Sequence, residues 1–149
     1  MRTSFTIFGD PIGKPRMTQK VKWERTDGQD RYFAWADKAR ETVTGNTNQK
    51  LNANDYLGFY AFAHIAMPDS WSAKQKTRHA GCLCLSKPDK DNIEKSIMDA
   101  IFEQDQRICL GGVVAKFWCE EGAEPRIDLF LLSLPKVDNA LPPKERASC

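Results

Sequence analysis

The chain lacks a long hydrophobic run: no stretch of its 149 residues approaches the roughly 20 apolar residues that span a bilayer. It also lacks the apolar core of a signal peptide, because Met1-Arg2-Thr3 leads directly into a short strand-like segment. Internal repeats and low-complexity tracts are missing as well. With an ordinary apolar fraction of 41%, these absences favour a single globular domain.

The cysteines do not form a recognisable framework. Their number is odd, and they lie at Cys82, Cys84, Cys109, Cys119 and Cys149. Three of them lie in apolar, strand-like sequence, which favours reduced thiols and a cytoplasmic location. The alternative is a zinc site made of the first four, but their spacing is unlike that of structural zinc sites.

Charge is unevenly distributed along the chain. Up to Pro88 there are 14 Lys or Arg against 8 Asp or Glu residues, a balance of +6. From Asp89 onward there are 8 against 12, a balance of −4. A basic part that holds phosphates and an acidic part that holds a metal would suit a nuclease. Chance segregation on a solvated surface is the alternative.

The order of elements predicts an α+β fold: a single mixed sheet with two main helices packed on it. The domain should span residues 1–134, and residues 135–149 should form a flexible tail. Residues 57–67 are apolar on both faces and should form a central strand, whereas residues 112–119 and 126–134 should form a hairpin. The remaining expected elements are strands at 3–8 and 81–85, a helix at 31–43 with Trp35 in the core, and loops at 12–22, 45–54 and 68–80.

The acidic stretch 87–101 should begin the second helix. Asp91 or Asn92 is a suitable N-cap after Pro88, and the residues that follow have helical period. One face would be apolar, with Ile93, Ile97, Ala100 and Ile101. The opposite face would present Asp91, Asn92, Lys95 and Asp99.

Three carboxylates could meet beside this helix, because a turn after Phe102 would fold Asp105 back towards Asp89 and Asp91. Like charges repel at such range, and a divalent cation would relieve the repulsion. Oxygen ligands suit Mg²⁺, with Mn²⁺ as a substitute. The alternative is a solvated helix face with capping acids. A helix-loop-helix calcium site lacks its glycine and its oxygen ligand, and an aspartyl phosphatase would need an apolar strand leading into Asp89.

The run Lys87-Pro-Asp-x-Asp-Asn-Ile-x-Lys-x-x-x-Asp-Ala-Ile, followed by Asp105, resembles the RusA family of Holliday-junction resolvases of phages and prophages. The resemblance implies that Asp89, Asp91 and Asp105 bind metal and that Lys95 is catalytic. Gln104 stands in place of the first Asp of the family's Asp-Asp pair. The resemblance also implies a homodimer in a bacterial or phage setting, and two-fold symmetry would suit a four-way junction.

Basic loops supply candidate DNA contacts. Lys14 and Arg16 lie in a Gly- and Pro-containing loop that resembles the family's N-terminal loop. Arginine forms bidentate hydrogen bonds with phosphate. Lys74, Lys76 and Arg78 lie near Trp71 in a second loop, where Trp71 could stack on an unpaired base or simply anchor the loop.

These observations predict a Mg²⁺-dependent endodeoxyribonuclease that resolves Holliday junctions or related branched DNA by paired nicking. The alternative is a non-catalytic nucleic-acid-binding protein, in which the acids only cap a helix. Cleavage in the presence of Mg²⁺ distinguishes the two.

Overall fold

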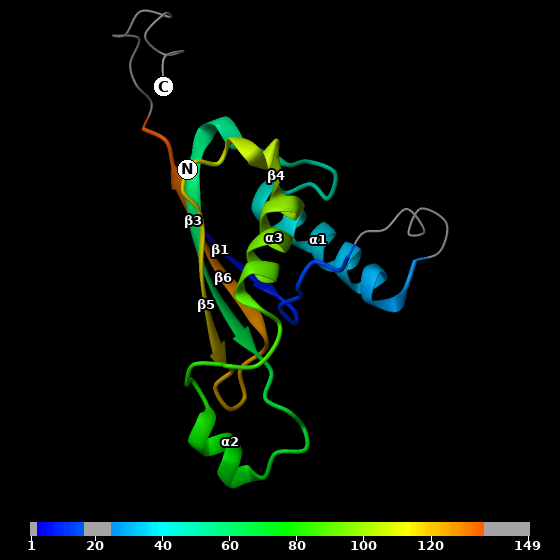
Figure 1. The fold of residues 1–149 in the computed structure, drawn as a ribbon, viewed down its shortest axis with the longest axis vertical. Helices are drawn as coiled ribbons and strands as arrows, with labels where there is room; N and C mark the ends of the chain where they lie inside the picture. Colours follow the sequence, from blue (N-terminus) through cyan, green and yellow to red (C-terminus); the bar gives the residue numbers. More distant parts are fainter. Residues whose placement is uncertain (1–2, 17–24, 136–149) are drawn as a thin grey trace, which may run out of the picture.

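The computed structural model describes residues 3–16 and 25–135 of the chain. The fold is α+β, as predicted, with a mixed four-stranded sheet and a second, two-stranded parallel sheet (Figure 1). The predicted tail, apart from Pro135, and the end of the loop 12–22 lie outside the described residues. The elements in order are β1 (Ser4–Phe8), α1 (Asp27–Thr44), β2 (Leu51–Asn52), β3 (Tyr56–Ile65), α2 (Ala73–His79), α3 (Lys90–Ile101), β4 (Phe102–Glu103), β5 (Gly111–Trp118) and β6 (Arg126–Ser133).

The main sheet has the strand order β1-β6-β3-β5. Strand β3 is central, as its two apolar faces predicted, and pairs antiparallel with β6 and parallel with β5. The predicted hairpin of the last two strands is therefore wrong: β3 lies between β5 and β6, which do not pair. The turn that follows Trp118 instead carries the chain across the end of β3.

The two long helices cover one face of the sheet. Helix α1 packs on β1, α3 packs on β5, and the helices contact each other (Figure 1). Their apolar sides meet the inward residues of the strands, so that Trp35, Ile97, Phe59 and Leu129 belong to one buried core. We call this the inner face of the sheet. On the outer face, Tyr60 and Phe62 are exposed, so only one of the two apolar faces of β3 is covered within the described residues.

Several local predictions need correction. Helix α1 begins at Asp27, where Thr26 and Gln29 form a capping box. The predicted loop 45–54 contains β2, and the predicted loop 68–80 contains α2. The predicted strand 81–85 is reduced to a single bridge between Leu83 and Phe117.

The described cysteines are all free thiols. Cys84 and Cys119 are buried, whereas Cys82 and Cys109 are exposed. Among residues 3–16 and 25–135, no helix is long and apolar enough to cross a membrane.

Candidate active site

Helix α3 places the candidate site on the surface of the domain. Its apolar residues Ile93, Ile97, Ala100 and Ile101 are buried, which confirms the predicted inward face. The helix begins two residues earlier than the earlier of the two predicted caps would allow, at Lys90 with Asp89 in the N-cap position. The Asp89 side chain makes no capping hydrogen bond, so its carboxylate is not used to satisfy the helix start.

A cleft of about 750 Å³ lies along the polar side of α3. Because helix positions three and four residues apart share a face, Asn92, Lys95 and Asp99 open into the same space. The remaining lining residues come from two other segments and are Lys14, Pro15, Arg16 and Asp105. The cleft thus combines carboxylates, an amide and basic side chains from three parts of the chain.

Asp105 reaches the cleft through a sharp turn. After β4 pairs with β2, Gln104 adopts the left-handed conformation, with φ 51° and ψ 53°. A single 3-10 turn, Asp105–Arg107, follows, and Arg107 donates a 3.0 Å hydrogen bond from Nη1 to Asn54 Oδ1. The turn thus brings Asp105 into one cleft with Lys95 and Asp99 of α3, whereas the expected meeting of Asp105 with Asp89 and Asp91 stays a prediction.

Asp89 and Asp91 stand at the beginning of α3 and are exposed. They are not among the residues that line the cleft. In the part of the chain that the structure describes, no three His, Cys, Asp or Glu side chains come close enough to hold a metal ion together. The ligand set Asp89, Asp91 and Asp105 therefore stays a prediction. The rejection of a zinc site made of four cysteines likewise rests on their spacing in the sequence alone.

The N-terminal loop is attached to α3 by three contacts. Ser96, which is fully buried, lies with Oγ 2.7 Å from the carbonyl oxygen of Ile12 and donates to it. The Lys14 amide donates to the carbonyl of Asn92 at 3.2 Å, and the Lys14 ammonium pairs with Asp99. These contacts fix the position of Lys14 over the polar side of the helix.

Gly13 permits this close approach. A Cβ atom at this position would lie 3.0 Å from Asn92 Cβ and 3.5 Å from Pro88 Cβ. The first contact is tighter than ordinary packing and would require a shift of a few tenths of an ångström, whereas the second is an ordinary contact. Glycine at position 13 lets the loop lie on α3 without that shift.

Asp99 also acts on its surroundings through its charge. The phenol of Tyr32, on α1, has its pKa raised to about 12, first by burial and then by the negative charge of Asp99. The Tyr32 phenol therefore stays protonated to a higher pH than an ordinary tyrosine.

A comparison with protein families decides the family. The sequence model described as endodeoxyribonuclease RusA matches residues 9–128, which include the N-terminal loop, α3 and Asp105. The chain belongs to the RusA family. No curated protein and no solved structure matched the chain. Membership identifies the chain as related to DNA endonucleases, and the acidic stretch that first suggested the family lies within the matched residues.

The second basic segment of this RusA-family chain is helical rather than a loop. Helix α2 begins with a capping box in which Ser72 and Gln75 satisfy each other's backbone amides. This Ser-x-x-Gln pattern is a helix-start signal in the sequence. None of the residues of α2 is buried, so the apolar period that would complete the signal is missing.

Trp71 anchors α2 to the end of the sheet. Its ring lies 5.0 Å from that of Trp118 in an edge arrangement and 4.9 Å from that of His79. Thr77 also donates a 2.9 Å hydrogen bond to Glu121. Of the two interpretations of Trp71, these contacts favour the anchor over a base-stacking platform.

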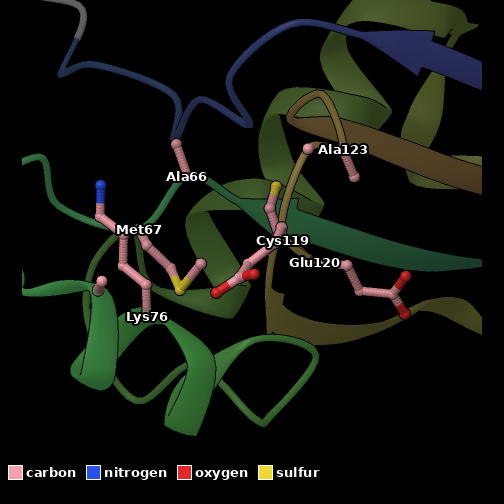
Figure 2. Close-up of a pocket in the computed structure, with 9 residues that line it drawn as sticks. Ala66, Met67, Lys76, Cys119, Glu120 and Ala123 are labelled. Carbon is pink, nitrogen blue, oxygen red and sulfur yellow. The ribbon is translucent and has the colours of Figure 1, made fainter.

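Of the predicted DNA contacts on α2, Lys74 and Arg78 are exposed and Lys76 is half-buried. Lys76 lines a hollow of about 310 Å³ between α2 and the turn after β5, together with Met67 and Cys119 (Figure 2). None of the three lines the cleft beside α3. The structure thus presents two separate basic regions, one at the cleft and one on α2.

Proposed function

We propose that this chain is a Mg²⁺-dependent endodeoxyribonuclease that resolves Holliday junctions or related branched DNA by paired nicking. The observation that carries the proposal is the cleft in which Lys95 and Asp105, from separate elements, meet Lys14 and Arg16. Family membership supports the nuclease activity.

The donor groups at the cleft fit Mg²⁺. Asn92, Asp99 and Asp105 offer oxygen atoms there, and Mg²⁺ commonly uses only one or two carboxylates with water and phosphate oxygens. The ligands we propose are Asp89, Asp91 and Asp105, with Mn²⁺ as a substitute; of these, Asp105 lines the cleft, whereas Asp89 and Asp91 lie at the start of α3 outside its lining. A bound Mg²⁺ would lower the pKa of a water molecule and stabilise the leaving oxygen.

The basic residues have distinct tasks. Lys95 lies one helical turn after Asp91 on the same side of α3, so its ammonium can stabilise negative charge that develops on the phosphate. Lys14 and Arg16 hold the DNA backbone at the cleft without reading bases. Lys74, Lys76 and Arg78 on α2 contact phosphates outside the cleft, on a neighbouring part of the branched substrate.

Two copies of the chain act together in this proposal. A four-way junction has two scissile strands related by near two-fold symmetry, and a two-fold dimer presents one cleft to each. Paired nicks then follow from one binding event.

Substitution of the acidic residues tests the proposed chemistry. Asp91→Asn and Asp105→Asn should slow Mg²⁺-dependent cleavage of a synthetic four-way junction by at least about 10²-fold, comparable to the loss of a group that stabilises the transition state. DNA binding should persist, because removing a carboxylate also removes repulsion of phosphate. Lys95→Met should slow cleavage to a similar extent.

Asp37→Asn is the matched control. Asp37 is an exposed acid on α1 that pairs with Arg40 and lies outside the cleft, so its loss should leave cleavage unchanged. If Asp91→Asn cleaves the junction at the rate of the wild type, the role assigned to Asp91 is wrong. A chain that shifts junction DNA on a gel but cuts no branched or linear DNA with Mg²⁺ or Mn²⁺ would be a binding protein instead.

A further inference from the structure

Lys116 lies on strand β5 and faces the helix side of the sheet. Its register partner on β3 is Ala63, which belongs to the buried core, so the Lys116 side chain points to the same inner face. Strand β5 forms an edge of the main sheet and packs against α3 (Figure 1). A charged side chain on an edge strand can protect that edge from pairing with another chain. The contacts of Lys116 indicate a more specific role.

The Lys116 ammonium binds the turn that leads into α3. Its Nζ atom donates to the Ser86 carbonyl at 2.6 Å and to the Pro88 carbonyl at 2.9 Å. The side chain is partly buried, and it forms no ion pair with the residues that the structure describes. Hydrogen bonds from a charged donor are about twice as strong as neutral ones, so the two contacts hold the segment 86–88 against β5.

The segment before this turn is also attached to β5, by its backbone. The Cys84 amide donates to the Lys116 carbonyl at 3.0 Å. Beyond Cys84, the Lys116 side chain continues the attachment to Ser86 and Pro88. The chain is therefore held along β5 up to the residue that precedes Asp89.

The first turn of α3 depends on anchors of this kind. Asp89 follows Pro88 directly and takes the N-cap position, but its side chain does not cap the helix. The Asp89 carbonyl accepts from the amides of Asn92 and Ile93, both at 3.1 Å, and these bonds close the first turn. The Asp89 carboxylate is thus not engaged in capping and can bind a metal ion. Lys116 fixes the peptide next to it.

Two carboxylates at one helix start repel each other, and Asp89 and Asp91 are both exposed. If the turn before them yields, they move apart when no metal is bound, and binding has to bring them back. An anchored turn lowers this cost, because a preorganised site loses less conformational freedom on binding. Partners that orient metal ligands without touching the ion typically contribute about 10–100-fold in metal affinity or activity.

A second anchor keeps the rest of α3 in place. Glu94, in the second turn of the helix, accepts a 3.0 Å hydrogen bond from the Gly112 amide on β5. Ile93 and Ile97 are fully buried beneath the helix. Removal of the Lys116 ammonium should therefore loosen the turn that it binds and the first turn of α3, without detaching the helix from the sheet.

We propose that Lys116 is a positioning residue of the candidate site: it holds the start of α3 so that Asp89 and Asp91 keep the places that a metal ion needs. This role rests on the proposed function, because it concerns the same metal ligands. Lys116 itself touches neither metal nor DNA. It differs in this from Lys95, whose ammonium acts on the phosphate.

Lys116→Met tests the attachment, because it removes the ammonium and keeps an unbranched side chain. Hydrogen exchange, measured without metal or DNA, should show the Asn92 and Ile93 amides exchanging at least about 10-fold faster than in the wild type, since the first turn opens more easily. The later turns of α3 should exchange as before. Lys50→Met is the matched control: Lys50 Nζ donates to the Asp99 carbonyl at 2.7 Å, at the other end of the same helix, so this variant should leave both amides unchanged.

Junction cleavage by the full chain provides the second readout. The Mg²⁺ concentration for half-maximal cleavage should rise at least about 10-fold in Lys116→Met and stay unchanged in Lys50→Met. The affinity for junction DNA, measured without divalent ions, should equal that of the wild type, and excess Mg²⁺ should restore much of the cleavage rate. A purely structural residue would lower the amount of folded protein without changing the Mg²⁺ requirement.

Four other results would each decide against part of this reasoning. Unchanged exchange at Asn92 and Ile93 in Lys116→Met would overturn the proposal, and so would a loosened turn with an unchanged Mg²⁺ requirement. An equal rise in the Mg²⁺ requirement of Lys50→Met would overturn it too, because the effect would not be local. Weaker DNA binding that accounts for the whole loss of cleavage would make Lys116 a phosphate contact instead. A wild type that cuts no junction at any Mg²⁺ concentration would refute the proposed function, and the exchange rates would still decide whether Lys116 holds the turn.

Discussion

Ser96→Ala should weaken the attachment of the N-terminal loop to α3. The hydroxyl is fully buried and supplies a 2.7 Å hydrogen bond to the Ile12 carbonyl, with the Ile93 carbonyl 2.8 Å away as the competing acceptor. Loss of the donor to this partly buried carbonyl costs up to about 1–3 kcal/mol. Alanine recovers about 0.5 kcal/mol through its helix propensity. We therefore expect a net loss of about 0.5–2.5 kcal/mol in the free energy of unfolding.

Urea unfolding measures this loss as a lower midpoint at unchanged m-value. In a domain of this size, the melting temperature should fall by about 1–10 °C. Because the loop carries Lys14 and Arg16 into the cleft, the KM for junction DNA should rise as well.

Thr42→Ala is the control for Ser96→Ala. The Thr42 hydroxyl donates to the Lys38 carbonyl within α1 and joins no two elements, so its loss should change stability by less than about 0.5 kcal/mol. If Ser96→Ala is as stable as the wild type, the hydroxyl bonds Ile93 within the helix, and it does not fasten the loop.

Three further substitutions test other parts of the structure. Asp99→Asn removes the partner of Lys14, a pair that is about 30% exposed, so the free energy of unfolding should fall by less than about 1 kcal/mol. DNA should bind more tightly, because Lys14 no longer has to leave a carboxylate to hold phosphate, and weaker binding would count against that role. Gln104→Asn should raise the melting temperature by about 2–4 °C, because asparagine tolerates the left-handed conformation better, and calorimetry that shows no gain would refute this. Burial, then the charge of Arg126, lowers the pKa of His64 below 6.5, so the unfolded chain binds the proton more readily and stability should decline as the pH falls below about 6.5; His64→Gln should remove this part of the decline in acid unfolding curves.

Local pattern was sufficient to predict α3 and its two sides. The apolar period of the stretch 87–101 depends only on helix geometry, and every residue predicted to face inward is buried. The turn at Asp105 was also predictable, because the short segment after Phe102 leaves little room for another path. The N-cap was misplaced because Asp89, Asp91 and Asn92 are all suitable cap residues.

Strand pairing was not predictable from the same kind of pattern. Two apolar strands joined by an acidic turn indicate a hairpin. In the structure β3 lies between them, because one of its edges pairs with β5 and the other with β6. Pairing depends on which strands meet across the whole sheet, and the free energy of those contacts outweighs sequence proximity. Helix α2 was missed because its capping box was present without an apolar face.

The amino-acid sequence by itself determined the family, the two-sided helix α3 and the chemical groups of the cleft, because all of these depend on residue types at short spacing. Only the tertiary structure decided that Lys14 pairs with Asp99, that Asp105 shares a cleft with Lys95, and that the helices leave the outer face of the sheet bare. The sequence of β3 is apolar on both faces, and the packing of the helices selects which face is buried.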